Sequence, residues 1–242
     1  MRYFGGKQRI SKYISEILNS LLKEEQPFVD LFCGSCNIIS KIDNNRLRIA
    51  NDKHYYLIEM WKALQNGWEM PNTISREEYY YIKNHKDENP PLAGFVGFGC
   101  SALGRWFDSS CYAEDKTGRN YCMNAKNSNL KILKKIQDVI FYNEDYKDVD
   151  IPIGSLVYCD IPYKNTVQYS PKEVGIFDHE EFYQWVRDNS NKYDIYISEF
   201  KHNVPDDFEI VWEKELKQSA RDIKENRETK FIVEVLMRYK NR

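Results

Sequence analysis

The sequence lacks the features of several protein classes. No apolar run in its 242 residues approaches the 18 or so that a membrane-spanning helix needs, so we expect no transmembrane segment. Residues 1–7 contain no apolar signal core, and we expect a cytoplasmic protein. Six cysteines are too few for a disulfide scaffold in a chain of this length, which predicts reduced thiols. Lysine and arginine (35) nearly balance aspartate and glutamate (37), so any nucleic-acid-binding face must be a local patch.

Metal ligands are also scarce and scattered. Cys33 and Cys36 have the C-x-x-C spacing of a zinc knuckle or a redox pair, but a structural zinc site needs a second ligand pair. Cys111 and Cys122 show no matching pattern, and the four histidines are spread along the chain. We therefore expect two small thiols in the core and no bound metal.

Strand-like and helix-like segments alternate along the chain. Helical periodicity in 7–24 and around 56–64 separates short apolar runs that are typical of buried strands. These runs are 28–32, 47–50, 139–142, 155–160 and 193–200, and two later runs, 208–212 and 230–237, predict an antiparallel hairpin. The alternation predicts an α/β fold with a seven-stranded, mainly parallel sheet that helices cover on both faces.

A middle segment has a different composition. Residues 88–125 contain Pro90-Pro91 and five glycines without regular periodicity, so we expect a loop-rich insertion. Between 98 and 135, seven basic residues stand against three acidic ones, with aromatic residues between them. Basic side chains can bind phosphates, and arginine can read guanine in the major groove. Taken alone, this composition also fits a solvated loop.

Three expected strands end in polar or small residues that would meet at one edge of the sheet. The strand at 28–32 leads into Gly34, the next ends at Asp52, and a later one ends at Asp160. Ligands of parallel sheets collect at this carboxyl edge. In Asp160-Ile161-Pro162-Tyr163, the carboxylate and a backbone carbonyl could accept the two hydrogens of an amine while the aromatic ring stacks on a flat heterocycle. A tetrapeptide of this kind is common, so its context decides its meaning.

Four separate motifs occur in one order along the chain. They are Arg2–Lys7, Phe28–Gly34, Asn51–Lys53 and Asp160–Tyr163. This order resembles the Dam-type DNA adenine-N6 methyltransferases of the alpha group, especially their phage-borne members. The resemblance implies a Rossmann-like S-adenosylmethionine-dependent methyltransferase fold, S-adenosylmethionine as cofactor and double-stranded DNA as substrate, with no obligatory protein partner.

The resemblance also implies a domain division and a role for individual residues. The catalytic domain would comprise 1–66 and 136–242, and an inserted target-recognition lobe 67–135. The cofactor site would be formed by Tyr3, Lys7, Asp30, Gly34, Asp52, Asp145 and Asp160. Catalysis would depend on Asp160, Pro162 and Tyr163. In the lobe, the basic composition predicts DNA contacts from Arg105, Arg119 and Lys126.

The chain departs from the family pattern at two positions, and two other functions stay open. Cys36 stands where the family has a second turn glycine, and Ile161 replaces the first proline of the common Asp-Pro-Pro-Tyr. One alternative is an RNA or protein amide N-methyltransferase, although such relatives usually have asparagine at the position of Asp160. The other is a catalytically silent DNA-binding protein on a methyltransferase scaffold, against which the intact cofactor and catalytic motifs argue.

Overall fold

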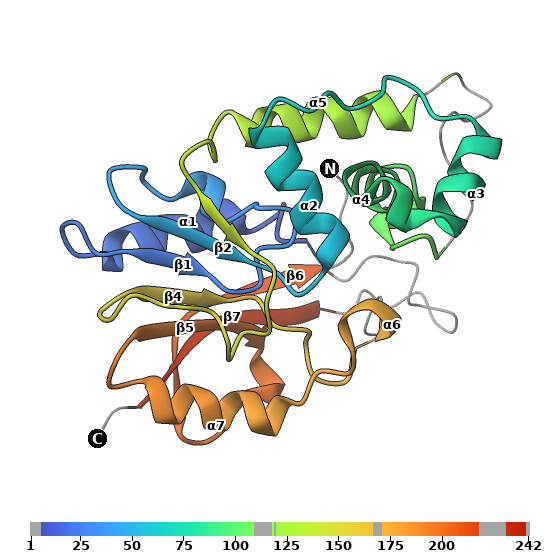
Figure 1. The fold of residues 1–242 in the computed structure, drawn as a ribbon. Helices are drawn as coiled ribbons and strands as arrows, with labels where there is room; N and C mark the ends of the chain where they lie inside the picture. Colours follow the sequence, from blue (N-terminus) through green and yellow to red (C-terminus); the bar gives the residue numbers. More distant parts are fainter. Residues whose placement is uncertain (1–5, 109–117, 119, 167–170, 218–230, 241–242) are drawn as a thin grey trace.

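A seven-stranded sheet forms the centre of the computed structural model, which describes residues 6–108, 118, 120–166, 171–217 and 231–240 (Figure 1). The strands are β1 (Phe28–Asp30), β2 (Arg48–Asn51), β3 (Ile140–Tyr142), β4 (Leu156–Cys159), β5 (Asp194–Phe200), β6 (Phe208–Lys217) and β7 (Phe231–Tyr239). They lie in the order β3-β2-β1-β4-β5-β7-β6. Strands β1 to β5 are parallel, and β7 lies antiparallel between β5 and β6. The predicted fold class, a Rossmann-like α/β fold with seven mainly parallel strands, is confirmed.

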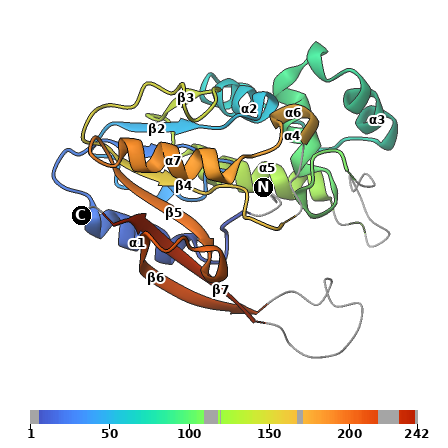
Figure 2. The same cartoon turned by 90° about the horizontal axis from the view of Figure 1, so that it is seen from below.

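The predicted C-terminal hairpin is also confirmed, and its strands are longer than the apolar runs alone indicated. β6 and β7 pair from Phe208↔Tyr239 to Lys217↔Phe231, with a register shift between Ile210 and Trp212. Polar and charged residues on β6 extend the pairing, because an edge strand can leave such side chains in solvent. Figure 2 shows the hairpin reaching beyond the other strands.

Helices cover both faces of the sheet, each over its own apolar cluster (Figures 1 and 2). The helices are α1 (Ser11–Leu21), α2 (Tyr55–Gln65), α3 (Arg76–Asn84), α4 (Pro90–Gly99), α5 (Tyr121–Leu133), α6 (Pro171–Val174) and α7 (His179–Asn189). Short 3₁₀ turns lie at Ile39–Lys41, Lys86–Glu88, Ala102–Gly104 and Lys201–Asn203. On one face, Ile14 of α1 and Trp61 of α2 are fully buried, and on the other face Phe182 and Val186 of α7 are fully buried.

The expectation of a loop-rich insertion at 88–125 is wrong for much of this segment, because it contains all of α4 and the start of α5. Pro90 and Pro91 occupy the first turn of α4, where no intrahelical hydrogen bond needs their missing N–H groups. The side chain of Asn89 caps the helix by accepting a hydrogen bond from the N–H of Leu92. Prolines that resembled loop signals therefore mark the start of a helix.

The glycines of α4 mark close packing. A Cβ atom on Gly94 would lie 2.1 Å from the carbonyl oxygen of Tyr56 in α2, and one on Gly97 would lie 2.3 Å from the indole of Trp106. Both distances are far below van der Waals contact, so only glycine fits. Because α4 packs so closely on α2, a single apolar core continues from the sheet into the helices of the middle segment.

Helices α3, α4 and α5 lie together at the end of the molecule toward which the parallel strands point (Figure 1). They come between β2 and β3 in the chain, as an inserted lobe would, and the boundaries 67–135 stay a prediction. Within the described residues, no helix is long and apolar enough to cross a membrane.

We predict that Gly94→Ala lowers the free energy of unfolding by about 3 kcal/mol, because the new methyl group would force α4 away from α2. Urea denaturation measures this loss. Gly67→Ala is the matched control: its Cβ would have no atom within 4 Å, but its φ of +87° costs an alanine about 1 kcal/mol. Equal losses in the two variants would contradict the close-packing explanation.

Candidate active site

A turn after β1 forms one wall of the candidate site. Gly34 has a φ of +47°, and its N–H donates to Oδ2 of Asp52 at 2.9 Å. The carbonyl of Gly34 accepts from the indole N–H of Trp61 at 3.1 Å. The other carboxylate oxygen of Asp52 accepts from the N–H of His54 at 2.9 Å. These bonds fix the turn against the end of β2 and the start of α2.

Asn51 joins three strand ends at this edge, a role that the sequence did not reveal. Its amide nitrogen donates to the carbonyls of Leu31 and Glu144, each at 3.1 Å, and its oxygen accepts from the N–H of Glu144 at 3.0 Å. The residue after Glu144, Asp145, forms an ion pair with Lys53 at 2.9 Å. Partial burial opposes ionisation of Asp145, but the hydrogen bonds from Lys53 and from the N–H of Lys147, together with the charges of these two lysines, outweigh it and lower the pKa of this carboxyl.

Two buried carboxyl groups lie on either side of the Gly34 turn. Asp30 is 1% exposed, and its Oδ1 has no hydrogen-bond partner among the described residues. Burial raises the pKa of Asp30 well above its usual range, and the nearby charges of Asp160 and Asp52 raise it further. Burial likewise raises the pKa of Asp52 to about 6, against the opposing effect of its two backbone hydrogen bonds. This part of the site therefore concentrates acidic groups whose ionised forms are disfavoured in the absence of a bound cation.

Lys7 binds two further carboxylates at the end of β4. Its Nζ lies 2.6 Å from Oδ1 of Asp160 and 3.0 Å from Oε1 of Glu234, and all three side chains are largely buried. Burial would lower the pKa of Lys7, but the attraction of the two carboxylates outweighs this effect and raises it. Burial raises the pKa of Asp160 to about 6, although Lys7 favours the ionised form. The ammonium of Lys7 thus forms ion pairs with two acidic groups.

Tyr163 completes this cluster. Its hydroxyl donates a hydrogen bond to Glu234, and its ring lies 4.3 Å from Nζ of Lys7. The ring also makes an edge contact with Phe200, with 4.5 Å between the ring centroids. Burial and the charge of Glu234 raise the pKa of Tyr163 well above its usual range, so the hydroxyl stays a hydrogen-bond donor. The ring is held in one orientation.

The backbone of the tetrapeptide is anchored on both sides. The carbonyl of Pro162 lies 2.7 Å from Nε2 of His179, at the start of α7. The N–H of Lys164 donates to Glu199 at 3.0 Å, and Asn203 donates to the carbonyl of Lys164 at 3.1 Å. The loop that carries the predicted catalytic residues is therefore attached to α7 and to the end of β5.

The structure brings most of the predicted site residues to one edge of the sheet. They are Lys7, Asp30, Gly34, Asp52, Asp145, Asp160, Pro162 and Tyr163. Tyr3 lies outside the described residues. Sequence reasoning missed Glu199 and Glu234. An acidic residue inside each of two otherwise apolar strands was the signal that could have identified them.

Two of the three predicted DNA-binding residues, Arg105 and Lys126, are described by the structure, and both belong to the predicted lobe. Arg105 is partly exposed. The ammonium of Lys126 donates to the carbonyl of Met70 and to the side chain of Asn72, each at 2.7 Å. Both of these hydrogen-bond acceptors belong to the predicted lobe. The contact of Lys126 with DNA stays a prediction. Arg119 lies outside the described residues.

Cys33 and Cys36 are buried together at the Gly34 turn. Their thiols share a hydrogen bond, and burial raises the pKa of both. Cys36 has a φ of +55°, so it adopts the left-handed conformation that a glycine adopts without strain. Among the described residues, no three histidine, cysteine or acidic side chains are grouped to hold a metal ion. The absence of a metal from this site stays a prediction.

Comparison with known proteins supports the sequence resemblance. Residues 3–98 match the family model of the D12 class N6 adenine-specific DNA methyltransferases. The predicted family resemblance is confirmed. The D12 match covers the motifs around Lys7, Gly34 and Asp52 and ends before Asp160 and Tyr163, whose assignment depends on the geometry above.

A curated relative agrees with the D12 match. The modification methylase StsI of Streptococcus sanguinis is 24% identical over 205 residues, which are 74% of this chain and 30% of that protein. The chain therefore spans less than a third of the length of this relative.

Solved structures are only distantly similar. The rRNA methyltransferase AviRa of Streptomyces viridochromogenes is 9% identical, with a TM-score of 0.39 over 96% of this chain and 84% of its own. The tRNA (m1A58) methyltransferase TrmI of Aquifex aeolicus is 12% identical, with a TM-score of 0.35 over 95% of this chain and 68% of its own.

We predict that Lys7→Met lowers the free energy of unfolding at pH 7 by about 3–5 kcal/mol, because it leaves buried carboxylates without their counter-charge. Loss of the ammonium also raises the pKa of Asp160 further. The folded variant then binds more protons than the unfolded chain, so its stability relative to the parent improves as the pH falls from 7 toward 5.

Urea denaturation at several pH values measures both effects. Lys53→Met is the matched control, since it removes a lysine from the more exposed pair with Asp145 and is expected to cost about 0–1 kcal/mol. A loss for Lys7→Met no larger than for this control would show that the buried pair contributes little.

Proposed function

We propose that this protein is a cytoplasmic enzyme that transfers a methyl group from S-adenosylmethionine to the N6 amine of adenine in double-stranded DNA. One observation carries the proposal. A buried carboxylate, Asp160, lies beside a fixed aromatic ring, Tyr163, at the carboxyl edge of the sheet. The same edge carries the Gly34 turn within the segment that matches the D12 family.

The residues of the edge fit S-adenosylmethionine, whose amino and sulfonium groups are cationic. Asp30 offers a buried oxygen that has no partner among the described residues, and the pKa of this carboxyl is raised mainly by burial and further by the negative charges of Asp160 and Asp52. A cation placed there would relieve that repulsion. We assign Asp30 and the Gly34 turn to the methionine part, Asp52 to the ribose hydroxyls and Asp145 to the adenine part. When bound, the cofactor supplies an electrophilic methyl group.

Asp160 would act on the amine of the target base. The lone pair of an adenine amine is delocalised into the ring, so the nitrogen is a poor nucleophile. A carboxylate and the carbonyl of Ile161 that accept its two hydrogens localise this lone pair. Lys7 binds Oδ1 of Asp160 and favours its ionised form, and we assign Oδ2 to the amine.

Tyr163 would hold the base. A base must leave the duplex to reach Asp160 at the sheet edge, which costs a few kcal/mol of stacking and pairing. Stacking of the base on an aromatic ring stabilises the bound state by about 1–3 kcal/mol. Glu234 and Phe200 fix the ring of Tyr163 before the base arrives, so little rotamer entropy is lost on binding.

The inserted lobe would select the DNA sequence. Helices α3 to α5 stand beside the carboxyl edge, where a duplex would lie if its base entered the site (Figure 1). Arg105 and Arg119 are the residues to which we assign DNA contacts, with Lys126 as a third contact only if it exchanges its partners within the lobe.

The test is methylation of unmodified plasmid DNA with S-adenosylmethionine, followed by mass spectrometry of the nucleosides. We expect N6-methyladenine from the parent. We predict that Asp160→Asn lowers the single-turnover rate by about 10²–10⁴-fold, because an amide is a weaker acceptor than a carboxylate. Asp150→Asn, at an exposed aspartate of the same domain, is expected to keep the parental rate.

Other results would favour the alternatives. Cofactor binding and DNA binding without methyl transfer would point to a silent DNA-binding protein. Methyl groups found in RNA or protein, with none in DNA, would point to an RNA or amide methyltransferase. A parental rate for Asp160→Asn would remove Asp160 from catalysis.

Cofactor binding should depend on pH. In the free protein, Asp52 and Asp160 have a pKa of about 6, so near pH 6 each binds part of a proton. A cationic ligand lowers both values and releases these protons. We therefore predict that affinity for S-adenosylmethionine weakens as the pH falls below about 6. Calorimetry in buffers of different ionisation enthalpy would detect the released protons, and an affinity independent of pH from 5 to 7 would contradict the prediction.

A further inference from the structure

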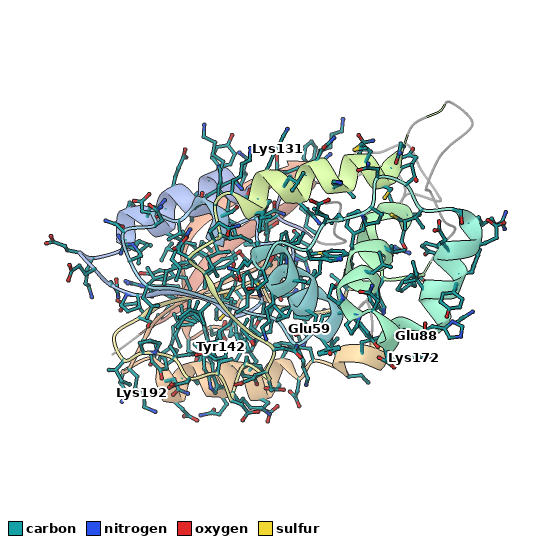
Figure 3. The ribbon with its side chains drawn as sticks, turned by 45° about the horizontal axis from the view of Figure 1, so that its top comes forward. Glu59, Glu88, Lys131, Tyr142, Lys172 and Lys192 are labelled. Carbon is teal, nitrogen blue, oxygen red and sulfur yellow. The ribbon has the colours of Figure 1, made fainter. Side chains whose placement is uncertain are left out.

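One hydrogen bond connects the lobe to the segment that follows the tetrapeptide. The indole N–H of Trp106, between α4 and α5, donates to Oε1 of Glu173 in α6 at 2.9 Å. In Figure 1, α6 lies at the same end of the molecule as α3 and α4. Figure 3 shows Lys172 of α6 and Glu88 of the lobe at the same end of the molecule, far from Lys192. α6 thus lies against the lobe although it belongs to the chain between β4 and β5.

The donor is held rigidly. Trp106 is 7% exposed, and its ring stacks on Tyr56 at 5.2 Å and meets the ring of His54 edge-on at 4.3 Å. Gly97 leaves just enough room for the indole, since a Cβ there would lie 2.3 Å from it. A side chain packed on so many sides has one rotamer, and its N–H therefore points to a fixed place.

The acceptor belongs to a segment that is otherwise anchored at its ends. At its start, Pro162 and Lys164 are bound by α7 and by the end of β5, as described above. At its end, Phe177 packs edge-on against Phe32, with ring centroids 5.8 Å apart. Just before Phe177, Ile176 is 87% exposed. The hydrogen bond at Glu173 therefore restrains α6 where the chain next to it is open to solvent.

The donor also touches the cofactor side of the site. His54, which Trp106 contacts, follows Asp52 by two residues and donates its backbone N–H to it. The hydrogen bond from Trp106 therefore joins three parts of the molecule: the turn that carries Asp52, the lobe, and the segment that continues from Asp160 and Tyr163.

We propose that the Trp106–Glu173 hydrogen bond positions the Asp160–Tyr163 tetrapeptide relative to the lobe, so that a base delivered by DNA on the lobe meets the carboxylate in the right place. Trp106 and Glu173 are positioning residues in this proposal, which rests on the proposed methyl transfer. An orientation error of about 1 Å at reacting atoms can cost two orders of magnitude in rate. Loss of this hydrogen bond is therefore expected to lower the turnover rate more than the stability of the fold.

The first measurement needs no activity. Hydrogen exchange of the full chain, followed over residues 160–166 and 171–177, is expected to be about tenfold faster in Glu173→Ala and in Trp106→Phe than in the parent. Phenylalanine keeps an aromatic ring in the pocket but has no N–H to donate. Glu173→Gln keeps an acceptor oxygen and is expected to restore parental exchange. Lys172→Ala, at an exposed residue of the same helix, is the matched control and should not change it.

The second measurement is methylation of plasmid DNA. We expect Glu173→Ala and Trp106→Phe each to lower kcat about tenfold with the KM for DNA unchanged, and the double variant to be no slower than either single variant. A general loss of folding would instead reduce the stability of each variant in urea. Glu173→Gln should recover a rate within about twofold of the parent.

The two measurements separate the two proposals. Faster exchange in 160–166 without methylation by the parent would support the positioning contact and overturn the proposed function. Unchanged exchange there, an additive double variant, or no recovery in Glu173→Gln would overturn the positioning contact and leave the methyl transfer standing.

Discussion

The site depends on one buried ammonium that is shared by two carboxylates. Moving Lys7, Asp160 and Glu234 out of water costs several kcal/mol for each charge, and that cost is recovered only if the charges meet at hydrogen-bond distance. They come from the N-terminal segment, the end of β4 and strand β7, so their contact ties together parts of the chain that are far apart in sequence. Tyr163 joins the same group through Glu234, and its ring orientation follows from it.

The surplus of acidic over basic groups at this edge has a chemical consequence. Lys7 pairs with Asp160 and Glu234, whereas Asp30 and Asp52 stay buried with raised pKa values. A fold that holds carboxyl groups in this state is less stable than one with apolar side chains there, unless a cation binds. The arrangement is therefore better explained by the charge of a ligand than by the stability of the empty protein.

The lobe is not an independent unit. Its helix α4 packs on α2 through glycines, and Trp106 packs on the residues that follow β2, so the lobe and the sheet share one apolar core. A shared core of this kind transmits position because packed side chains have few alternative arrangements. It holds the lobe at a fixed place beside the carboxyl edge of the sheet.

The sequence by itself indicated the strands, their mainly parallel direction and the edge at which Gly34, Asp52 and Asp160 meet, because alternating apolar segments and the residues at strand ends are local signals. The order of the strands in the sheet came only from the structure. The prediction of loops in 88–125 was wrong for much of that segment. The prolines occupy the first turn of α4, and the glycines allow α4 to pack closely on its neighbours. Only the tertiary structure decided that Glu199 and Glu234 belong to the site and that Trp106 reaches Glu173. Those contacts join residues between 35 and more than 200 positions apart, and no local pattern records which distant partner a buried charge or donor will meet.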